Sequence, residues 1–335
     1  MAEVSKNSVT QAIVSEDEQG QRIDNFLLRV CKGVPKSHVY RIVRSGEIRV
    51  NSKRVDASYR LRLGDVLRIP PVRVARHEEE IVAGAEFNAE LPVIYEDEAL
   101  LAVDKPAGIA VHGGSGVSFG VIEALRRQRP QSRFLELAHR LDRETSGVLL
   151  VGKKRSALTA LHDMFREGAA GGGVRTTDKR YLVLVKGRWM DPVRHVKLPL
   201  HKYLLDSGER RVRVQEDGKP SCTVFRLLAR WRSYSLLEAE LKTGRTHQIR
   251  VHLAHLGHPI AGDEKYGDFT FNRELQKSGL KRMFLHAWKI RFPHPLSGDT
   301  MTVEAPLPRV LEEFIDRISS IETQDYGQKF RPSGV

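Results

Sequence analysis

A change in composition near residue 70 constrains the fold of this 335-residue chain more than any other feature. Residues 22–73 hold 13 Lys and Arg against 4 Asp and Glu, so they carry most of the formal net charge of +13. The prolines Pro70 and Pro71 and the acidic run at 78–80 follow. The chain is long enough for two hydrophobic cores. We predict a flexible tail at 1–20, a small basic domain at 21–73, a linker at 74–90, a large domain at 91–322 and a flexible tail at 323–335.

The basic segment has the pattern of two short helices followed by a small sheet. Residues 22–28 suit one helix, and a second would start at 35–37 with Ser37 as a candidate cap and stop at Gly46. Alternation near residue 50 and again at 61–69 predicts strands. Five cations would lie on this helix and hairpin: Arg41, Arg44, Arg49, Lys53 and Arg54. Such a surface binds nucleic-acid phosphates with little sequence readout. The alternative is a solvated helix face, and the local excess of positive charge favours phosphate binding.

Composition narrows the classes of protein to consider. The sequence pI of about 9.8 indicates a polyanionic partner. Cys31 and Cys222 are the two cysteines, and their wide spacing fits neither a disulfide framework nor a zinc site. The sequence lacks a run of about 18 apolar residues and an apolar signal core in its first 21 residues. We therefore expect a soluble, cytoplasmic protein.

Beyond residue 91, short apolar strands alternate with helical segments. The strands include 100–103 and 183–185, and the helices 121–129 and 156–165. This alternation predicts an α+β fold with a mixed sheet. The Gly-rich stretch at 168–178 is predicted to be a surface insertion, with a flexible flap over a ligand as the alternative.

Residues 139–150, HRLDRETSGVLL, place Asp142 immediately before an apolar strand, where functional groups are commonly displayed. By itself, an Asp beside Arg and Thr is more typical of a cap or a solvated ion pair. Three further motifs follow the same pattern of polar residues against apolar strands: DKPAG with VH at 104–112, KRYLVLV at 179–185, and TGRTHQIRVH at 243–252, trailed by GHPI and GDxxYG at 257–267.

These ordered motifs, spanning about residues 91–310, resemble those of the RluA-type pseudouridine synthases, and the basic unit resembles an S4 RNA-binding domain. The resemblance implies a large, mostly antiparallel sheet with the active cleft along one face. It also implies isomerisation of uridine to pseudouridine in RNA, with 23S ribosomal RNA of the large subunit as the expected substrate and partner.

The reaction breaks the bond from ribose C1′ to uracil N1 and rejoins the base through C5, so it needs no cofactor and no metal. The resemblance makes Asp142 the catalytic carboxylate, which either attacks C1′ or removes a ribose proton. It makes Arg250 the cation that keeps Asp142 ionised, and Tyr181 the ring that holds uracil and assists proton removal from C5. Without the resemblance, Arg250 would be an ordinary surface residue and Tyr181 a half-buried strand residue. Further site residues are Arg140, which would fill the space left by the flipped base, and Ile249 and Val251, which would line the uracil pocket.

Three alternatives compete with this interpretation of the sequence. Four histidines, His247, His252, His255 and His258, crowd into twelve residues, but their spacing around Arg250 fits the family motif better than a zinc site. A second alternative is a non-catalytic RNA-binding or ribosome-assembly factor, but intact Asp142, Tyr181 and Arg250 favour an enzyme. An RNA glycosidase or nuclease is weaker, because the motifs place no second acid.

Overall fold

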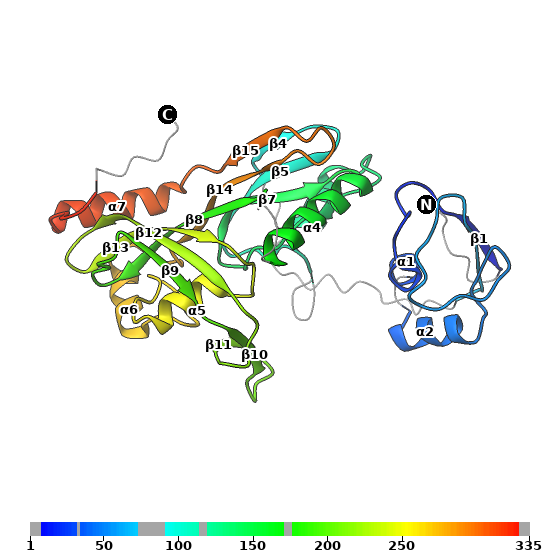
Figure 1. Ribbon diagram of the computed structural model, residues 1–335, viewed down its shortest axis with the longest axis horizontal. Helices are drawn as coiled ribbons and strands as arrows, with labels where there is room; N and C mark the ends of the chain where they lie inside the picture. The colour runs from blue at the N-terminus through cyan, green and yellow to red at the C-terminus, as the bar shows by residue number, and fades with distance from the viewer. Residues whose placement is uncertain (1–7, 32–33, 73–90, 114–118, 171–175, 328–335) are drawn as a thin grey trace. The chain divides into compact units, whose positions relative to one another are not determined.

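The computed structural model describes residues 8–31, 34–72, 91–113, 119–170 and 176–327 (Figure 1). The chain divides into two compact units, residues 1–85 and 86–335. The predicted linker at 74–90 lies outside the described residues.

The N-terminal unit packs two short helices against a small sheet. Its elements are β1 (Thr10–Ile13), α1 (Ile23–Val30), α2 (Lys36–Arg44), β2 (Arg49–Val50) and β3 (Val66–Ile69). In the described residues the strands form a three-stranded antiparallel sheet in the order β1-β3-β2. Apolar residues at helical spacing, such as Phe26, Leu27, Val39 and Ile42, fill the core beneath it. Gly46 follows α2 with φ +77, as predicted for a helix stop.

Two predictions for this unit were wrong. Thr10–Ile13 is an edge strand paired with Val66–Ile69, so the segment predicted as a flexible tail is ordered from residue 8 onward. Its burial is that of an exposed edge strand, in which Ala12 alone is buried and Ile13 is 73% exposed. Ser37 lies inside α2, whose N-cap is Pro35 and lacks a side-chain cap. The ring of Pro35 fixes its φ near the value that a helix start requires, so α2 begins there without a side-chain cap.

The larger unit is a sheet covered by helices. Its strands are β4 (Val93–Glu96), β5 (Leu100–Lys105), β6 (Glu136–Leu137), β7 (Ser146–Gly152), β8 (Asp178–Lys186), β9 (Val193–Lys197), β10 (Leu200–Leu204), β11 (Arg210–Val214), β12 (Cys222–Arg230), β13 (Tyr234–Leu241), β14 (Leu285–Pro293) and β15 (Thr300–Glu304). Its helices are α3 (Val121–Gln128), α4 (Arg155–Ala170), α5 (Gln248–His255), α6 (Phe269–Lys277) and α7 (Arg309–Ile321).

The main sheet runs in the order β4-β5-β7-β14-β8-β13-β12-β9, with β15 on β14 and β6 on β7. Among its described pairs, β7 and β14 alone run parallel, which confirms the α+β fold with a mostly antiparallel mixed sheet. Alternation along the strands separates two faces. One face packs with α3 and α5, while the other packs with α4 and α7. β10 and β11 form a separate hairpin that projects beyond the sheet near α5 (Figure 1).

A glycine is required where β7 meets β14. Gly147 has φ +111, a conformation that side-chain-bearing residues rarely adopt. A Cβ at this position would overlap the carbonyl oxygen of Ala287. The glycine therefore allows the parallel pairing of Ser146 with His286, and that pairing places the start of β7 in the centre of the sheet.

Two further boundary predictions need correction. The C-terminal segment predicted as flexible from residue 323 is held at its start, because Asp325 pairs with Arg188 and Arg230 and the carbonyl of Tyr326 accepts from the Arg230 amide. Within the Gly-rich stretch, residues 168–170 continue α4 and Asp178 opens β8, since alanines favour a helix where glycine does not. Residues 171–175 and 328–335 lie outside the described part. In the described residues, none of the helices has the length and apolar character to cross a membrane.

Candidate active site

Asp142 lies in the loop that leads into β7, and a second loop fixes its backbone. The Asp142 carbonyl accepts from the Thr145 amide at 3.1 Å in a tight turn. The next residue, Arg143, exchanges two hydrogen bonds with Gly108: its carbonyl accepts from the Gly108 amide and its Nε donates to the Gly108 carbonyl, both at 2.9 Å. The DKPAG motif therefore braces the HRLD motif, although about 35 residues separate them in sequence.

Lys105 completes this brace from beneath. Its side chain is fully buried, and Nζ donates to the carbonyls of Pro106, Ile109 and Arg143 at 2.8, 2.8 and 3.0 Å. Burial lowers the pKa of Lys105 to about 7, and burial raises the pKa of the neighbouring Asp104 to about 6. Lys105 is the donor in all three hydrogen bonds. It therefore holds the loop of Pro106 and Ile109 to the loop that carries Asp142 and Arg143.

Arg250 reaches Asp142 from α5, and the start of that helix is pinned by Gln248. The Gln248 side-chain oxygen accepts from Thr243 Oγ1 at 2.8 Å, and its nitrogen donates to the Cys222 carbonyl and to Thr223 Oγ1 at 3.0 and 2.9 Å. These bonds join the helix to β12 and to the end of β13. The TGRTHQIR motif thus sets both the position and the direction of α5.

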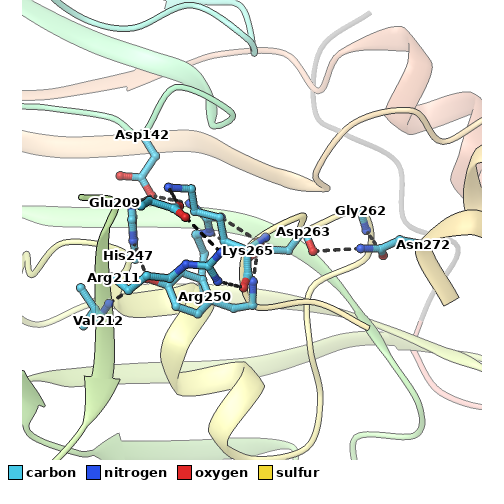
Figure 2. Close-up of polar contacts among 11 residues, drawn as sticks. Asp142, Glu209, Arg211, Val212, His247, Arg250, Gly262, Asp263, Lys265 and Asn272 are labelled. Atoms are coloured by element: carbon cyan, nitrogen blue, oxygen red, sulfur yellow. Dashed lines mark hydrogen bonds and ion pairs between the residues drawn. The ribbon is translucent and has the colours of Figure 1, made fainter. Parts of the chain in front are cut away.

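Arg250 lies between two carboxylates, as Figure 2 shows. Its Nε and Nη2 bind Asp263 in a bidentate pair at 2.8 and 2.7 Å, while its Nη1 lies 3.3 Å from Asp142 Oδ2. Asp263 Oδ1 also accepts from the Lys265 and Tyr266 amides. The side chains of Arg250 and Asp263 are 4% and 1% exposed, whereas Asp142 is 28% exposed and faces outward. Asp263 therefore holds the guanidinium, and the guanidinium presents its remaining edge to Asp142.

The charges of this cluster reinforce one another. Burial would raise the pKa of Asp263, but its hydrogen bonds from Arg250 and the amides hold the pKa below its ordinary value. Burial works against the charge of Arg250, yet the two carboxylates keep its pKa above the ordinary value. Arg250 consequently stays charged at any physiological pH.

His247 approaches the same oxygen of Asp142 as Arg250 does. Its Nε2 lies 3.8 Å from Asp142 Oδ2, and its Nδ1 lies 2.8 Å from the Tyr266 hydroxyl, which accepts from the Val212 amide of β11 at 3.0 Å. Burial lowers the pKa of His247, so its ring is neutral near pH 7. His247 also has φ +54, an unusual conformation for a residue with a side chain. The sequence motif at 243–252 contains His247 but predicts no catalytic role for it.

The structure places the remaining predicted site residues as follows. Tyr181 of β8 is 8% exposed, and burial together with the charge of Asp142 raises the pKa of its phenol well above the ordinary value. Ile249 packs in the same core cluster as Tyr181. Val251 packs instead with Leu200 and the β10–β11 hairpin, which fits an anchor for the hairpin better than a wall of the uracil pocket. Arg140 is exposed in the loop before Asp142.

The other histidines of the α5 region have partners within the protein or face solvent. His252 is fully buried between Ser221 and Thr223, at 2.9 and 3.0 Å. His258 Nδ1 contacts the Lys186 carbonyl at 3.0 Å, and His255 is exposed. Within the described ranges, His, Cys, Asp and Glu side chains do not gather in groups of three that could hold a metal ion.

The cations predicted to bind phosphate in the N-terminal unit are all exposed: Arg41, Arg44, Arg49, Lys53 and Arg54. Ion pairs in the described residues do not involve any of these five. Their charges are therefore available to a partner.

Comparison with known proteins identifies the family. The model of the RNA pseudouridylate synthase family matches residues 99–255, and the S4 domain model matches residues 21–67. Three curated relatives named "Ribosomal large subunit pseudouridine synthase C" match almost end to end. The Escherichia coli (strain K12) protein is 52% identical over 316 residues, covering 93% of this chain and 97% of its own. The Pasteurella multocida protein is 52% identical, covering 93% and 94%, and the Yersinia pestis protein 53%, covering 92% and 95%.

The chain belongs to the RNA pseudouridine synthase family. This synthase is an isomerase that converts uridine to pseudouridine in RNA, and its N-terminal unit is an S4 domain. The solved structure titled "Human RNA Pseudouridylate Synthase Domain Containing 1" has a TM-score of 0.56 and 23% identity, covering 72% of this chain and 91% of its own, and it supports the fold.

Sequence reasoning missed Asp263, His247 and Tyr266 as parts of the site. Part of the signal was present, because RTHQIR at 245–250 and GDxxYG at 262–267 follow each other closely in sequence. What could not be seen was that the second acid and the tyrosine fold back onto Arg250 and His247.

Proposed function

We propose that this synthase isomerises specific uridines of the large-subunit, 23S, ribosomal RNA, with Asp142 as the catalytic carboxylate. The observation that carries the assignment of Asp142 is its partly exposed carboxylate, held by a buried Arg250 that is itself held by Asp263. The substrate assignment rests on the relatives, which match nearly their whole length under one ribosomal name. The proposed substrate implies a cytoplasmic location.

The charge on Asp142 is what the chemistry needs. In the described residues, the recorded contacts of the Asp142 carboxylate fall on Oδ2, so Oδ1 is the atom presented to ribose. Oδ1 either attacks C1′ or removes a ribose proton, and the bond from C1′ to N1 then breaks with its electron pair on uracil. After rotation, C5 bonds to C1′ while the bond from Oδ1 to C1′ breaks or, in the other route, while Oδ1 returns the proton to the ribose. The C5 proton then leaves and N1 gains a proton. Atoms and electrons balance without an added reagent.

Tyr181 acts in this scheme as a neutral phenol. Its raised pKa makes a phenolate costly beside the negative Asp142. The ring therefore supports the uracil, and the hydroxyl relays the C5 proton rather than holding a charge. Ile249 would close the apolar side of the base, and Arg140 would enter the space that the flipped base leaves in the RNA.

The S4 domain supplies affinity through phosphate contacts. Arg41 and Arg44 lie one helical turn apart on α2, and Arg49, Lys53 and Arg54 lie on and after β2. Contacts of this kind neutralise phosphates and release counterions, which gives binding with little sequence preference. Selection of the target uridine would then fall to the catalytic unit.

Incubation of the protein with transcribed 23S ribosomal RNA, followed by mapping of pseudouridine at single-nucleotide resolution, tests the proposal. Asp142→Asn serves as the matched control because it keeps the shape and removes the charge. Site-specific pseudouridine with the wild type alone supports the proposal. Tight binding without modification would favour the alternative, a non-catalytic assembly factor. Base loss or strand cleavage would indicate a glycosidase or nuclease.

A further inference from the structure

His247 and Tyr266 form a chain of polar contacts that the reaction scheme above does not use. The chain starts at the Val212 amide on β11, passes through the Tyr266 hydroxyl and the His247 ring, and ends 3.8 Å from Asp142 Oδ2. Figure 2 shows Val212, His247 and Asp142 in this order on one side of Arg250. A strained backbone at His247, with φ +54, keeps the ring in line, and strain of this kind persists only where surrounding contacts impose it.

The hydrogen-bond partners determine which ring nitrogen of His247 carries the proton. The Tyr266 hydroxyl oxygen accepts from the Val212 amide, so its own proton is available to donate to His247 Nδ1. A neutral ring that accepts at Nδ1 carries its proton on Nε2, which faces Asp142. The opposite tautomer would direct the Nε2 lone pair at the carboxylate and would leave the Tyr266 proton without this acceptor. The first assignment therefore pairs the Tyr266 hydroxyl with His247 Nδ1 and directs the Nε2 proton toward Asp142 Oδ2.

The segment that carries Tyr266 is attached to the β10–β11 hairpin by further contacts. Arg211 donates to the Lys265 carbonyl, and Lys265 pairs with Glu209 at 2.5 Å, so strand β11 and the turn after Asp263 move together. Arg250 and Arg211 both lie over the Tyr266 ring, with 5.2 and 5.7 Å to its centroid. The position of the hairpin thus sets the position of the Tyr266 hydroxyl.

We propose that His247 and Tyr266 are positioning residues that tie the β10–β11 hairpin to Asp142 and turn Asp142 Oδ1 toward the ribose. Arg250 Nη1 donates to Oδ2 at 3.3 Å, and His247 Nε2 lies 3.8 Å from the same oxygen, just beyond hydrogen-bond length. A small approach of His247 would add a second donor and fix the rotation of the carboxylate about its last bond. Arg250 alone would leave that rotation open. RNA that presses on the hairpin would, through Tyr266, tighten the 3.8 Å approach. This inference rests on the proposed role of Asp142.

Two substitutions at His247 separate positioning from packing. His247→Gln keeps a nitrogen donor near the place of Nε2 but loses the acceptor for Tyr266. His247→Asn keeps an acceptor near the place of Nδ1 but loses the donor to Asp142. Asn tolerates a positive φ better than Gln does, so the Asn protein should be the more stable of the two. If His247 acts by positioning Asp142, the two variants should rank in opposite orders for rate and for stability. The His247→Gln protein should react faster, and the His247→Asn protein should be more stable.

The experiment measures the single-turnover rate, the RNA dissociation constant and the melting temperature on 23S ribosomal RNA. We expect His247→Asn to lower the rate on the order of 100-fold and His247→Gln on the order of 10-fold, since small misplacements of a reacting group cost about this much. RNA dissociation constants should stay within about twofold of the wild type. His255→Gln, an exposed histidine on the same helix, is the control and should match the wild type in all three measurements.

A double-mutant cycle tests whether the two residues act as one unit. Tyr266→Phe keeps the ring under both arginines and removes the hydroxyl. If the chain is a unit, Tyr266→Phe combined with His247→Gln will be no slower than the slower single variant. Multiplying effects, rates that follow melting temperature, or losses confined to RNA affinity would each overturn the inference. A wild type that makes no pseudouridine would instead overturn the proposed function, so the two failures are distinguishable.

Discussion

The two units of the molecule use the same cationic residues in opposite ways. In the S4 domain, Arg41 and Arg44 are exposed and outside the ion pairs of the described chain. In the catalytic unit, Arg250 is buried between Asp142 and Asp263, and Arg226 bridges Glu238 and Glu240 across the sheet. Net charge therefore does not measure RNA-binding capacity. Arg41 and Arg44 of the first unit are available to phosphate, whereas Arg250 and Arg226 of the second hold carboxylates in place.

The largest expected effect concerns the charge that the catalytic unit organises. Asp142→Asn should lower the single-turnover rate by at least about 1000-fold, because Asn can neither attack C1′ nor accept a ribose proton. Binding of 23S ribosomal RNA should change little, because the S4 cations are untouched. Quantitative mapping of pseudouridine alongside a filter-binding assay checks both. Substantial turnover by the Asn protein would move the catalytic role to another residue.

The second prediction compares one arginine from each unit. Arg250→Met should lower the free energy of unfolding by about 3–5 kcal/mol, because it leaves Asp263 buried without its partner. Arg41→Met should change it by less than about 0.5 kcal/mol, as an exposed and unpaired residue does. Chemical denaturation of both variants gives the values. Equal losses would mean that the division of cations between the units is wrong.

The third prediction is a loss of stability in mild acid that originates in the catalytic unit. Burial lowers the pKa of His252 and of His286 to about 4, against about 6.5 in an unfolded chain. The unfolded chain then binds more protons between these values, so stability is complete above about pH 6.5 and is lost as the pH falls toward 4. Each histidine should contribute on the order of 1–3 kcal/mol. Asp104, whose pKa is raised to about 6, opposes this trend between about pH 6 and 4.

Denaturation curves at several pH values, repeated with His252→Gln and His286→Gln, check the third prediction. His286 Nε2 lies 3.2 Å from the Ala305 carbonyl and Nδ1 lies 2.9 Å from Ser146 Oγ, so the neutral ring donates to the carbonyl and accepts from the hydroxyl. Protonation of Nδ1 would force the Ser146 hydroxyl to change from donor to acceptor. Each variant should flatten the pH dependence between about 6.5 and 4. An unchanged slope in both would assign the acid loss to other groups.

The smallest expected effect belongs to the S4 domain. The double change Arg41→Gln with Arg44→Gln should reduce the slope of log binding constant against log salt by roughly 1.4–1.8, at about 0.7–0.9 per lost phosphate contact. The melting temperature of this double variant should equal that of the wild type. Arg226→Gln in the catalytic unit is the reverse control, with a lower melting temperature and the wild-type slope. A salt titration of RNA binding measures both slopes. An unaltered slope in the double variant would mean that α2 does not contact the RNA.

Sequence patterns predicted those parts of the molecule that depend on neighbours along the chain. The helix near Val121 and the stop at Gly46 follow from periodicity and backbone preference, and the structure confirms them. Thr10–Ile13 was missed because a polar edge strand has no signal of its own until Val66–Ile69 pairs with it. The end of α4 at Ala170 was also not predicted, because sequence patterns define helix ends less well than helix interiors.

The candidate site shows the same difference between features set by local sequence and features set by long-range contacts. Asp142, Tyr181 and Arg250 were predicted from motifs, and the structure brings Arg250 to Asp142. The bond from Arg250 to Asp263 is invisible in the motifs, since two local segments fold back on each other to form it. Sequence motifs predict candidate site residues more readily than they reveal the contacts that hold those residues in place.

The parallel pairing of β7 with β14 has a consequence for how the enzyme is made. His286 joins Ser146 only after about 140 residues have been added, and closing so long a loop makes the contact slow to form. A ribosome synthesising this chain therefore releases the HRLD segment long before the strand that fixes it exists. The central pairing of the large sheet can form only after β14 (Leu285–Pro293) has been synthesised, whereas the S4 domain, which has a core of its own, is complete long before.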